Sequence, residues 1–119
     1  MTLEQTLVQA LGALVSGRAF PDVVPPSTAF PCITYQQVGG GAGWYADQSV
    51  PGKASSRIQV NVHSKTRLEA NQLARQVERA IAAAFNESQP YGAFVAIYDD
   101  AALLYTTRQD FGIQFAVSL

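Results

Sequence analysis

The chain has 119 residues, which favours a single domain spanning residues 1–119, and a hydrophobic fraction of 48 % is enough to build a core. Its eight Lys and Arg residues are scattered and the formal net charge is −1, so it lacks the concentrated basic patch of a duplex-DNA binder, and we expect no sequence-specific nucleic-acid binding. Only 14 % of the residues are charged, which favours a surface partly covered by neighbouring subunits.

The cysteine content and the N-terminal pattern bear on the compartment. A single cysteine, Cys32, allows no disulfide within the chain. The N-terminus lacks the basic region and long apolar run of a signal peptide, and no apolar run approaches the length that spans a membrane. We therefore expect a protein that is made and kept in the cytoplasm, with no membrane partner.

A helix is expected over residues 3–15. Thr2 and Gln5 have the spacing of a capping box at its start, and Gly17 lies where it should stop. The apolar stripe between them has helical spacing: Leu3, Leu7, Ala10, Leu11 and Leu14. Four prolines in residues 20–31 then predict an extended connector rather than a regular element. A short strand follows over residues 32–38, with Ile33 and Tyr35 on one face.

Residues 39–52 are predicted to form a flexible, glycine-rich loop. Glycine raises the conformational entropy of the unfolded chain, and no periodic apolar pattern here offsets that cost. Two large aromatic side chains in such a loop are unusual. Either Trp44 folds back onto its own domain, or it contacts a partner, since Trp and Tyr often anchor interfaces. The candidate partner-contact residues are Gly39, Gly40, Gly41, Trp44, Tyr45 and Asp47.

The centre of the chain is predicted to be a strand that runs directly into a helix. Residues 57–63 alternate polar and apolar side chains, as in a half-buried strand. Thr66 and Glu69 have the spacing of a second capping box, and Asn86 can adopt the left-handed conformation that ends a helix. Residues 67–85 between them carry an apolar stripe that includes Leu73, Ala74, Val77, Ile81 and Phe85.

The last third of the chain is predicted to contain two more strands. A polar connector over residues 86–92 leads to a strand over 93–98, which is apolar on both faces and is therefore expected in the interior of the sheet. A long final strand over 103–119 is expected to bend or bulge near Gly112. The order helix, strand, strand, helix, strand, strand predicts an α+β fold in which two helices pack on one mainly antiparallel or mixed sheet.

No motif in the sequence predicts a cofactor or a metal. Gly52-Lys53 resembles the end of a phosphate-binding loop, but that motif requires glycine where Asp47 stands and Ser or Thr where Ala54 stands. One histidine and one cysteine cannot build a Cys/His zinc site. The adjacent carboxylates Asp99 and Asp100 fit a solvated turn better than a catalytic pair. We therefore expect no cofactor and no metal site.

A Cys/His nucleophile pair is the one catalytic arrangement that the geometry permits. A hairpin with Val38 opposite Arg57 places Cys32 opposite His63, on the same face of the sheet. No helix N-terminus and no orienting acid is evident to activate the thiol. A buried thiol and a surface histidine are therefore favoured, and we expect no enzymatic activity.

Three stretches of the chain carry a family resemblance: Phe30-Pro31-Cys32-Ile33-Thr34-Tyr35, then residues 57–62 with Ser64, Thr66, Ala70 and Leu73, then Arg108-Gln109-Asp110-Phe111-Gly112-Ile113. They resemble the proline-led first strand, the central strand and helix, and the last strand of the small tail-completion proteins of long-tailed phages and prophages. That family is related in architecture to tail terminators. The resemblance implies a ring, usually of six subunits, that caps the tail tube and joins it to the head connector, and it implies no catalysis.

The resemblance predicts a structural protein that acts by assembly. Each subunit would offer one surface to its neighbour in a head-to-tail contact, and rotation would close the ring. The partners would be other copies of the chain, tail-tube proteins and head-connector proteins, and the protein would occupy the virion tail after assembly in the cytoplasm of a bacterial host. The alternatives are a small cytoplasmic binding or regulatory domain that acts as a dimer and, less favoured, an enzyme that uses Cys32 and His63.

Overall fold

The structure is a computed structural model and describes residues 2–40 and 53–116. Its elements in chain order are α1 (Leu3–Gly12), β1 (Ala19–Pro21), β2 (Cys32–Gln37), β3 (Lys53–Ser64), α2 (Arg67–Ala84), β4 (Ser88–Pro90), β5 (Val95–Asp99) and β6 (Leu104–Ala116). The predicted α+β class and the predicted order of helices and strands are confirmed. Two short strands, β1 and β4, join the four predicted ones.

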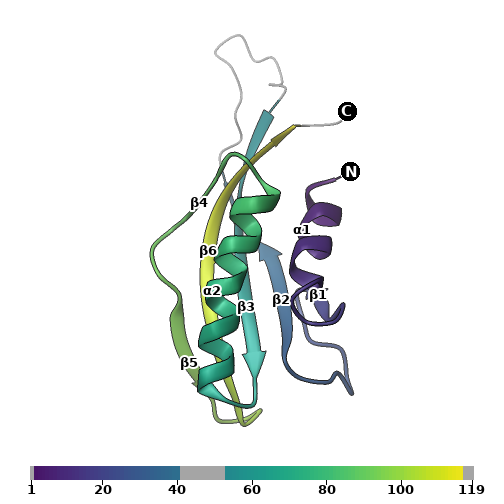
Figure 1. Cartoon of the computed structure of the whole chain (residues 1–119), viewed down its shortest axis with the longest axis vertical. Coiled ribbons are helices and arrows are strands. Elements are labelled where there is room, and N and C mark those ends of the chain that lie inside the picture. The colour runs from purple at the N-terminus through teal and green to yellow at the C-terminus, as the bar shows by residue number, and fades with distance from the viewer. Residues whose placement is uncertain (1, 41–52, 117–119) are drawn as a thin grey trace.

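The six strands form one mixed sheet. Its order is β1-β2-β3-β6, with β4 and β5 both beside β6 (Figure 1). β1 pairs parallel with β2, and all the other pairs are antiparallel. β3 and β6 pair along their full described length, from Lys53 opposite Ala116 to Ser64 opposite Tyr105. Both helices lie on the same face of the sheet (Figure 1).

The core lies between that face of the sheet and the two helices. Alternation along the strands directs every second residue toward the helices, and the resulting cluster includes Leu7 and Leu11 of α1, Ile33 and Tyr35 of β2, Ile58, Val60 and Val62 of β3, Leu73, Val77 and Ile81 of α2, and Phe111 and Ile113 of β6. The predicted placement of Ile33 and Tyr35 on one face is confirmed. Every regular element except β4 and β5 contributes to this core.

The start of α1 is the predicted capping box. The Gln5 backbone N–H donates to Thr2 Oγ1 at 3.1 Å, and the Thr2 N–H donates to Gln5 Oε1 at 2.9 Å. The helix stops at Gly12, not at residue 15 as predicted. The Gly17 N–H reaches back to the Gly12 carbonyl at 2.8 Å with Gly17 at a φ of 84°, so a turn replaces the last predicted residues.

The start of α2 differs from a simple capping box. Thr66 Oγ1 accepts from the Glu69 N–H at 3.2 Å, as predicted. The Glu69 carboxylate, however, accepts from the buried Ser64 hydroxyl at 2.6 Å, and Ser64 Oγ in turn accepts from the Thr66 N–H at 3.2 Å. The Ser64 hydroxyl therefore lies between the Thr66 N–H and the Glu69 carboxylate, which a simple capping box would join directly. The prediction that Asn86 ends α2 in a left-handed conformation is wrong. The helix ends instead at buried Phe85, which has an extended φ of −128°.

Two predicted connectors contain short strands. The extended connector over residues 20–31 begins inside β1, and the polar connector over 86–92 contains β4. Each strand has three residues and one partner, so no period-two pattern develops along it. The predicted interior strand over 93–98 is wrong in its placement: β5 pairs with β6 alone, and four of its five residues are exposed.

Of the bend or bulge predicted near Gly112, the bulge is wrong. β6 keeps one constant register with β3 across Gly112. The irregularity lies in the chain that faces β6 on its other side, where Pro90 pairs with Phe111 but Val95 pairs with Arg108. The chain between β4 and β5 therefore contains more residues than the segment of β6 that it passes.

The stripe of α2 gives a test with an internal control. Leu73 is 6 % exposed and Leu68 is 70 % exposed on the same helix. We expect Leu73→Ala to lower the free energy of unfolding by about 2–5 kcal/mol, because it removes buried methyl groups and leaves a cavity. Leu68→Ala should change it by less than about 0.5 kcal/mol. Urea melts of both variants measure the difference, and equal losses would show that the stripe does not pack as described.

Candidate assembly surfaces

The predicted partner-contact residues divide at the end of the β2–β3 hairpin. Gly39 and Gly40 are described, whereas Gly41, Trp44, Tyr45 and Asp47 lie outside the described residues. The backbone pairing of the hairpin continues past β2: the Val38 N–H donates to the Arg57 carbonyl, and the Arg57 N–H donates to the Gly39 carbonyl, both at 2.8 Å. The predicted loop therefore begins one residue later than its glycine content suggested.

Gly40 is needed where it stands because the backbone of β3 passes very close. Its φ is 139°, a conformation that side chains rarely adopt. A Cβ at this position would lie 2.8 Å from Ser56 Cα and would also collide with the Ser55 carbonyl. Gly39 has a φ of 123° but open space around it. The two glycines thus fix how the chain leaves the sheet toward residue 41.

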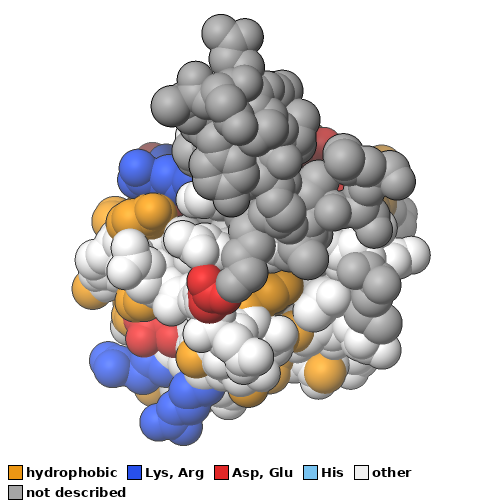
Figure 2. Space-filling model, turned by 90° about the horizontal axis from the view of Figure 1, so that it is seen from above, with side chains coloured by type: hydrophobic (Ala, Val, Ile, Leu, Met, Phe, Trp, Pro, Cys, Tyr) orange, Lys and Arg blue, Asp and Glu red, His pale blue; other side chains and the backbone are white. Residues whose placement is uncertain are grey.

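This end of the molecule is where β3 and β6 extend beyond both helices (Figure 1). Figure 2 looks onto it along the long axis. Among the described side chains visible in that view, acidic and basic groups both occur; at the lower left they adjoin, and elsewhere hydrophobic and other side chains separate them. The visible described surface at this end therefore presents no broad field of one charge.

The face of the sheet opposite the helices is polar. Its central side chains come from the alternate positions of β2, β3 and β6: Thr34, Gln36, Arg57, Gln59, Asn61, His63, Arg108 and Asp110. Arg57 Nε lies 2.7 Å from Asp110 Oδ2, and Arg108 Nε donates to Asn61 Oδ1 at 3.3 Å. Both contacts join β3 to β6 across the face, so this polar surface is ordered by its own side chains.

Tyr91 lies on the polar face beside Gly112. A Cβ on Gly112 would come within 2.9 Å of Tyr91 Cζ, so the ring occupies the space that a side chain would fill. The Arg57 guanidinium carbon lies 4.8 Å from the centre of the same ring, a cation–π contact. The Tyr91 N–H also donates to the Asp110 carbonyl at 2.9 Å. Gly112 thus accommodates Tyr91 rather than a bulge.

Cys32 and His63 stand opposite each other, as the hairpin predicted. Cys32 is fully buried, and burial raises the pKa of its thiol to about 11, an effect that Arg18 only partly offsets. His63 is half-buried, and its Nε2 lies 2.9 Å from Thr34 Oγ1. A thiol with so high a pKa is protonated at neutral pH and is a poor nucleophile. The predicted burial of Cys32 is confirmed.

Alkylation tests the state of this thiol. We expect iodoacetamide to leave Cys32 unmodified in the native protein near neutral pH, because the thiol is buried and protonated. The denatured chain should be labelled stoichiometrically under the same conditions, as mass spectrometry will show. Rapid, complete labelling of the native protein at mildly acidic pH would instead indicate an activated thiolate.

His63 predicts a pH dependence of stability. Burial lowers the pKa of its imidazole below the usual 6.5, and Asp99 opposes this shift. Just below pH 6.5 the unfolded chain therefore binds a proton that the folded chain does not, so the free energy of unfolding falls as the pH falls through this window. We expect His63→Gln, which removes the single histidine, to flatten that part of the profile in urea melts. An unchanged slope would assign the effect to other groups.

Arg67, the first residue of α2, was missed by prediction from the sequence, and its side chain joins β5 to β6. Its Nη1 donates to the Thr106 carbonyl at 3.2 Å and its Nη2 to the Ile97 carbonyl at 3.0 Å. A cation in the first turn of α2 opposes the helix dipole. That unfavourable position was a signal, available in the sequence, that Arg67 serves a purpose outside its own helix.

The described residues leave two surfaces for a functional role, and a metal cluster is not among them. Within residues 2–40 and 53–116, no group of three or more His, Cys, Asp or Glu side chains is placed to hold a metal ion. In the same part of the chain, no helix has the length and apolar character to cross a membrane. What the fold presents is an ordered polar sheet face and, at β5, an exposed strand.

Comparison with known proteins gives the family. The sequence model of the family described as "Tail completion protein gp17" matches residues 6–111. The chain therefore belongs to this family of phage structural proteins, and the resemblance read from three short stretches is confirmed. No curated protein matches the chain.

Solved structures show the same fold. A chain from the structure titled "Virion of native gene transfer agent (GTA) particle" is 18 % identical, with a TM-score of 0.51, and the match covers 97 % of this chain and 95 % of that one. At this identity the likeness shows the fold alone. It extends over nearly the whole of both chains, so the α+β architecture is shared from end to end.

Proposed function

We propose that this protein forms a ring, with the six subunits that are usual in the family. The ring caps the tail tube of a phage or prophage particle and joins it to the head connector. The observation that carries the proposal is the family match over residues 6–111. The low charged fraction of 14 % supports it, because subunits of a ring cover much of one another's surface. Assembly takes place in the host cytoplasm, and the product resides in the virion tail.

The ring closes through head-to-tail contacts. Such contacts use two different surfaces of each subunit, and rotation returns the last subunit to the first. The sheet presents two different edges, β1 on one side and β4 with β5 on the other. That difference suits a head-to-tail contact better than a two-fold one. Isolated subunits are monomers in dilute solution and associate at high concentration or on a tail tip.

We further propose that residues 39–52 contact a neighbouring subunit or the tail tube. The segment begins at Gly39 and Gly40, which are exposed, and Gly40 lies against Ser55 and Ser56 of β3. Burial of Trp44 and Tyr45 would supply a few kcal/mol at about 25 cal/mol per Å² of apolar area. Repetition around the ring multiplies a weak contact, so each copy needs only a modest affinity.

Deletion of Gly41–Gln48 tests this assembly role. In a complementation assay we expect the deletion variant to fold yet to yield tails that fail to join heads, because the contact segment is gone. Ala42→Ser with Ala46→Ser is the matched control and should assemble normally. Trp44 is the single tryptophan, so its emission should shift to the blue when rings form. Normal joining by the deletion variant would refute the contact role of this segment.

A further inference from the structure

β5 is an edge strand with one neighbour. It pairs with β6 from Val95 opposite Arg108 to Asp99 opposite Leu104, and none of the described strands lies on its other side. Val95 is 58 % exposed and Tyr98 is 46 % exposed. Backbone groups that face away from β6 along such an edge are a template for another strand.

The other edges of the sheet are protected against such pairing. β1 has three residues and ends in Pro21, and β4 has three residues and ends in Pro90. Short length and proline are two of the devices by which proteins block unwanted strand addition. β5 has five residues, contains neither proline nor lysine, and carries its one charge at the terminal Asp99. Among the described edges, β5 alone is long and unblocked.

β5 is attached by specific contacts although it lies outside the core. The core cluster contains no residue of the segment 86–103, which we call the 86–103 ribbon. The ribbon is attached by polar and cation–π contacts from α2 and β6. Arg67 bridges the Ile97 and Thr106 carbonyls and stacks 5.0 Å from the centre of the Tyr105 ring. Tyr105 in turn packs on Tyr98 at a centroid distance of 4.9 Å.

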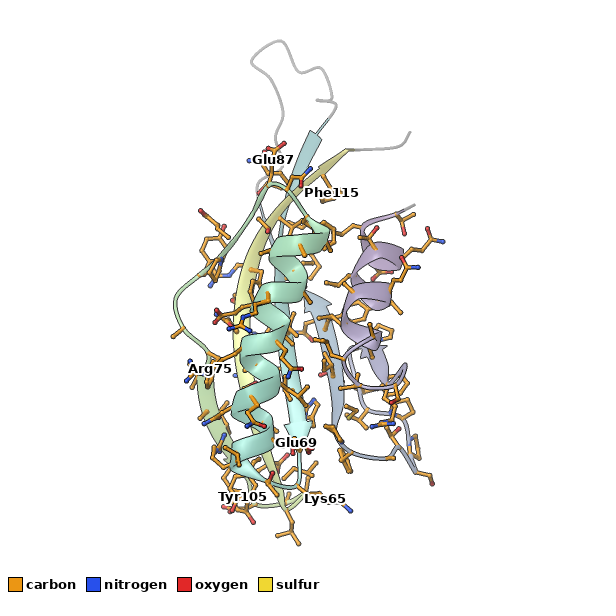
Figure 3. The ribbon with its side chains drawn as sticks, in the orientation of Figure 1. Lys65, Glu69, Arg75, Glu87, Tyr105 and Phe115 are labelled. Atoms are coloured by element: carbon orange, nitrogen blue, oxygen red, sulfur yellow. The ribbon has the colours of Figure 1, made fainter. Side chains whose placement is uncertain are left out.

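The same pattern holds at the start of β5. Arg75 lies on the flank of α2 toward β5 (Figure 3), with its guanidinium carbon 5.8 Å from the centre of the Phe94 ring. Buried Gln109 donates through Nε2 to the Gly92 carbonyl at 2.9 Å and to Glu78 Oε1 at 3.0 Å. These contacts fix the conformation of the edge in advance, which lowers the entropy that a partner strand loses on binding.

We propose that β5 accepts an extended segment of the neighbouring subunit, which adds to the sheet as a further strand. The inference rests on the ring of the proposed function. In a closed ring each subunit has one such edge and one neighbour in the same direction, so a segment of a second copy covers every edge once. Main-chain hydrogen bonds supply the affinity of strand addition, and the exposed Val95 and Tyr98 select an apolar, uncharged segment.

Lysines on the edge test the proposal. Val95→Lys with Ala96→Lys introduces the residue that protects natural edges. Both side chains are exposed and lie outside the core and outside the Tyr98–Tyr105 stack, so the variant should melt like the wild type. We expect its self-association, measured by sedimentation velocity, to require a concentration at least about tenfold higher. Leu68→Lys, at an exposed site on α2, is the control and should associate like the wild type. Equal association of the edge variant and the control would overturn the proposal.

A photo-crosslinker identifies the occupant. Benzoylphenylalanine at position 95, in particles complemented by that variant, should form an adduct with a peptide of a second copy at a position other than 95, as mass spectrometry of the band will show. Three results would overturn strand addition from a neighbour without contradicting the proposed ring. They are an adduct with a tube or connector protein, a symmetric adduct between two positions 95, and the lack of any adduct in particles that contain the ring. Particles that join heads and tails without any ring of this protein would overturn the proposed function as well.

Discussion

The antiparallel pairing of β3 with β6 is the constraint on which the rest of the structure depends. The two strands keep one register from Lys53 opposite Ala116 to Ser64 opposite Tyr105, and every other strand except β1 pairs directly with one of them. Because side chains alternate along a strand, a slip of one residue would turn the apolar residues of β3 away from the helices. Burial of Ile58, Val60 and Val62 therefore specifies the register, and the register positions everything beside it.

Placing both helices on one face leaves the opposite face to polar side chains. Contacts such as the Arg57–Asp110 pair order that face but add little to stability, since exposed ion pairs contribute about 0–1 kcal/mol. Stability comes from the helix side, where the apolar residues of α1 and α2 meet the sheet. The polar face and the 86–103 ribbon are consequently free to serve contacts with other molecules without a cost to the core.

Periodicity determines how much of this could be predicted from the sequence. The alternation in residues 57–63 and the helical spacing after Thr66 predicted β3 and α2, and the hairpin geometry predicted Cys32 opposite His63. Strands of three residues, β1 and β4, have no period to detect. The prediction that β5 lies in the interior of the sheet was wrong for another reason. Apolar composition shows which side chains can be buried, but whether they are buried depends on which elements lie beside them. Of the candidate contact residues, Gly39 and Gly40 alone fall within the described chain.

In the 86–103 ribbon, polar groups make the contacts with the rest of the domain and apolar side chains are exposed, which is the opposite of the usual arrangement. An ordinary edge strand faces the core with apolar residues and the solvent with polar ones. Here Arg67, Arg75 and Gln109 add polar and cation–π contacts to the strand pairing with β6, while Val95 and Tyr98 remain largely exposed. The exposed apolar area of these two side chains does not stabilise the free subunit, because apolar area stabilises only when it is covered. An element of this kind is consistent with a subunit whose fold is complete alone but whose surface is complete only in an assembly, as expected of a virion component.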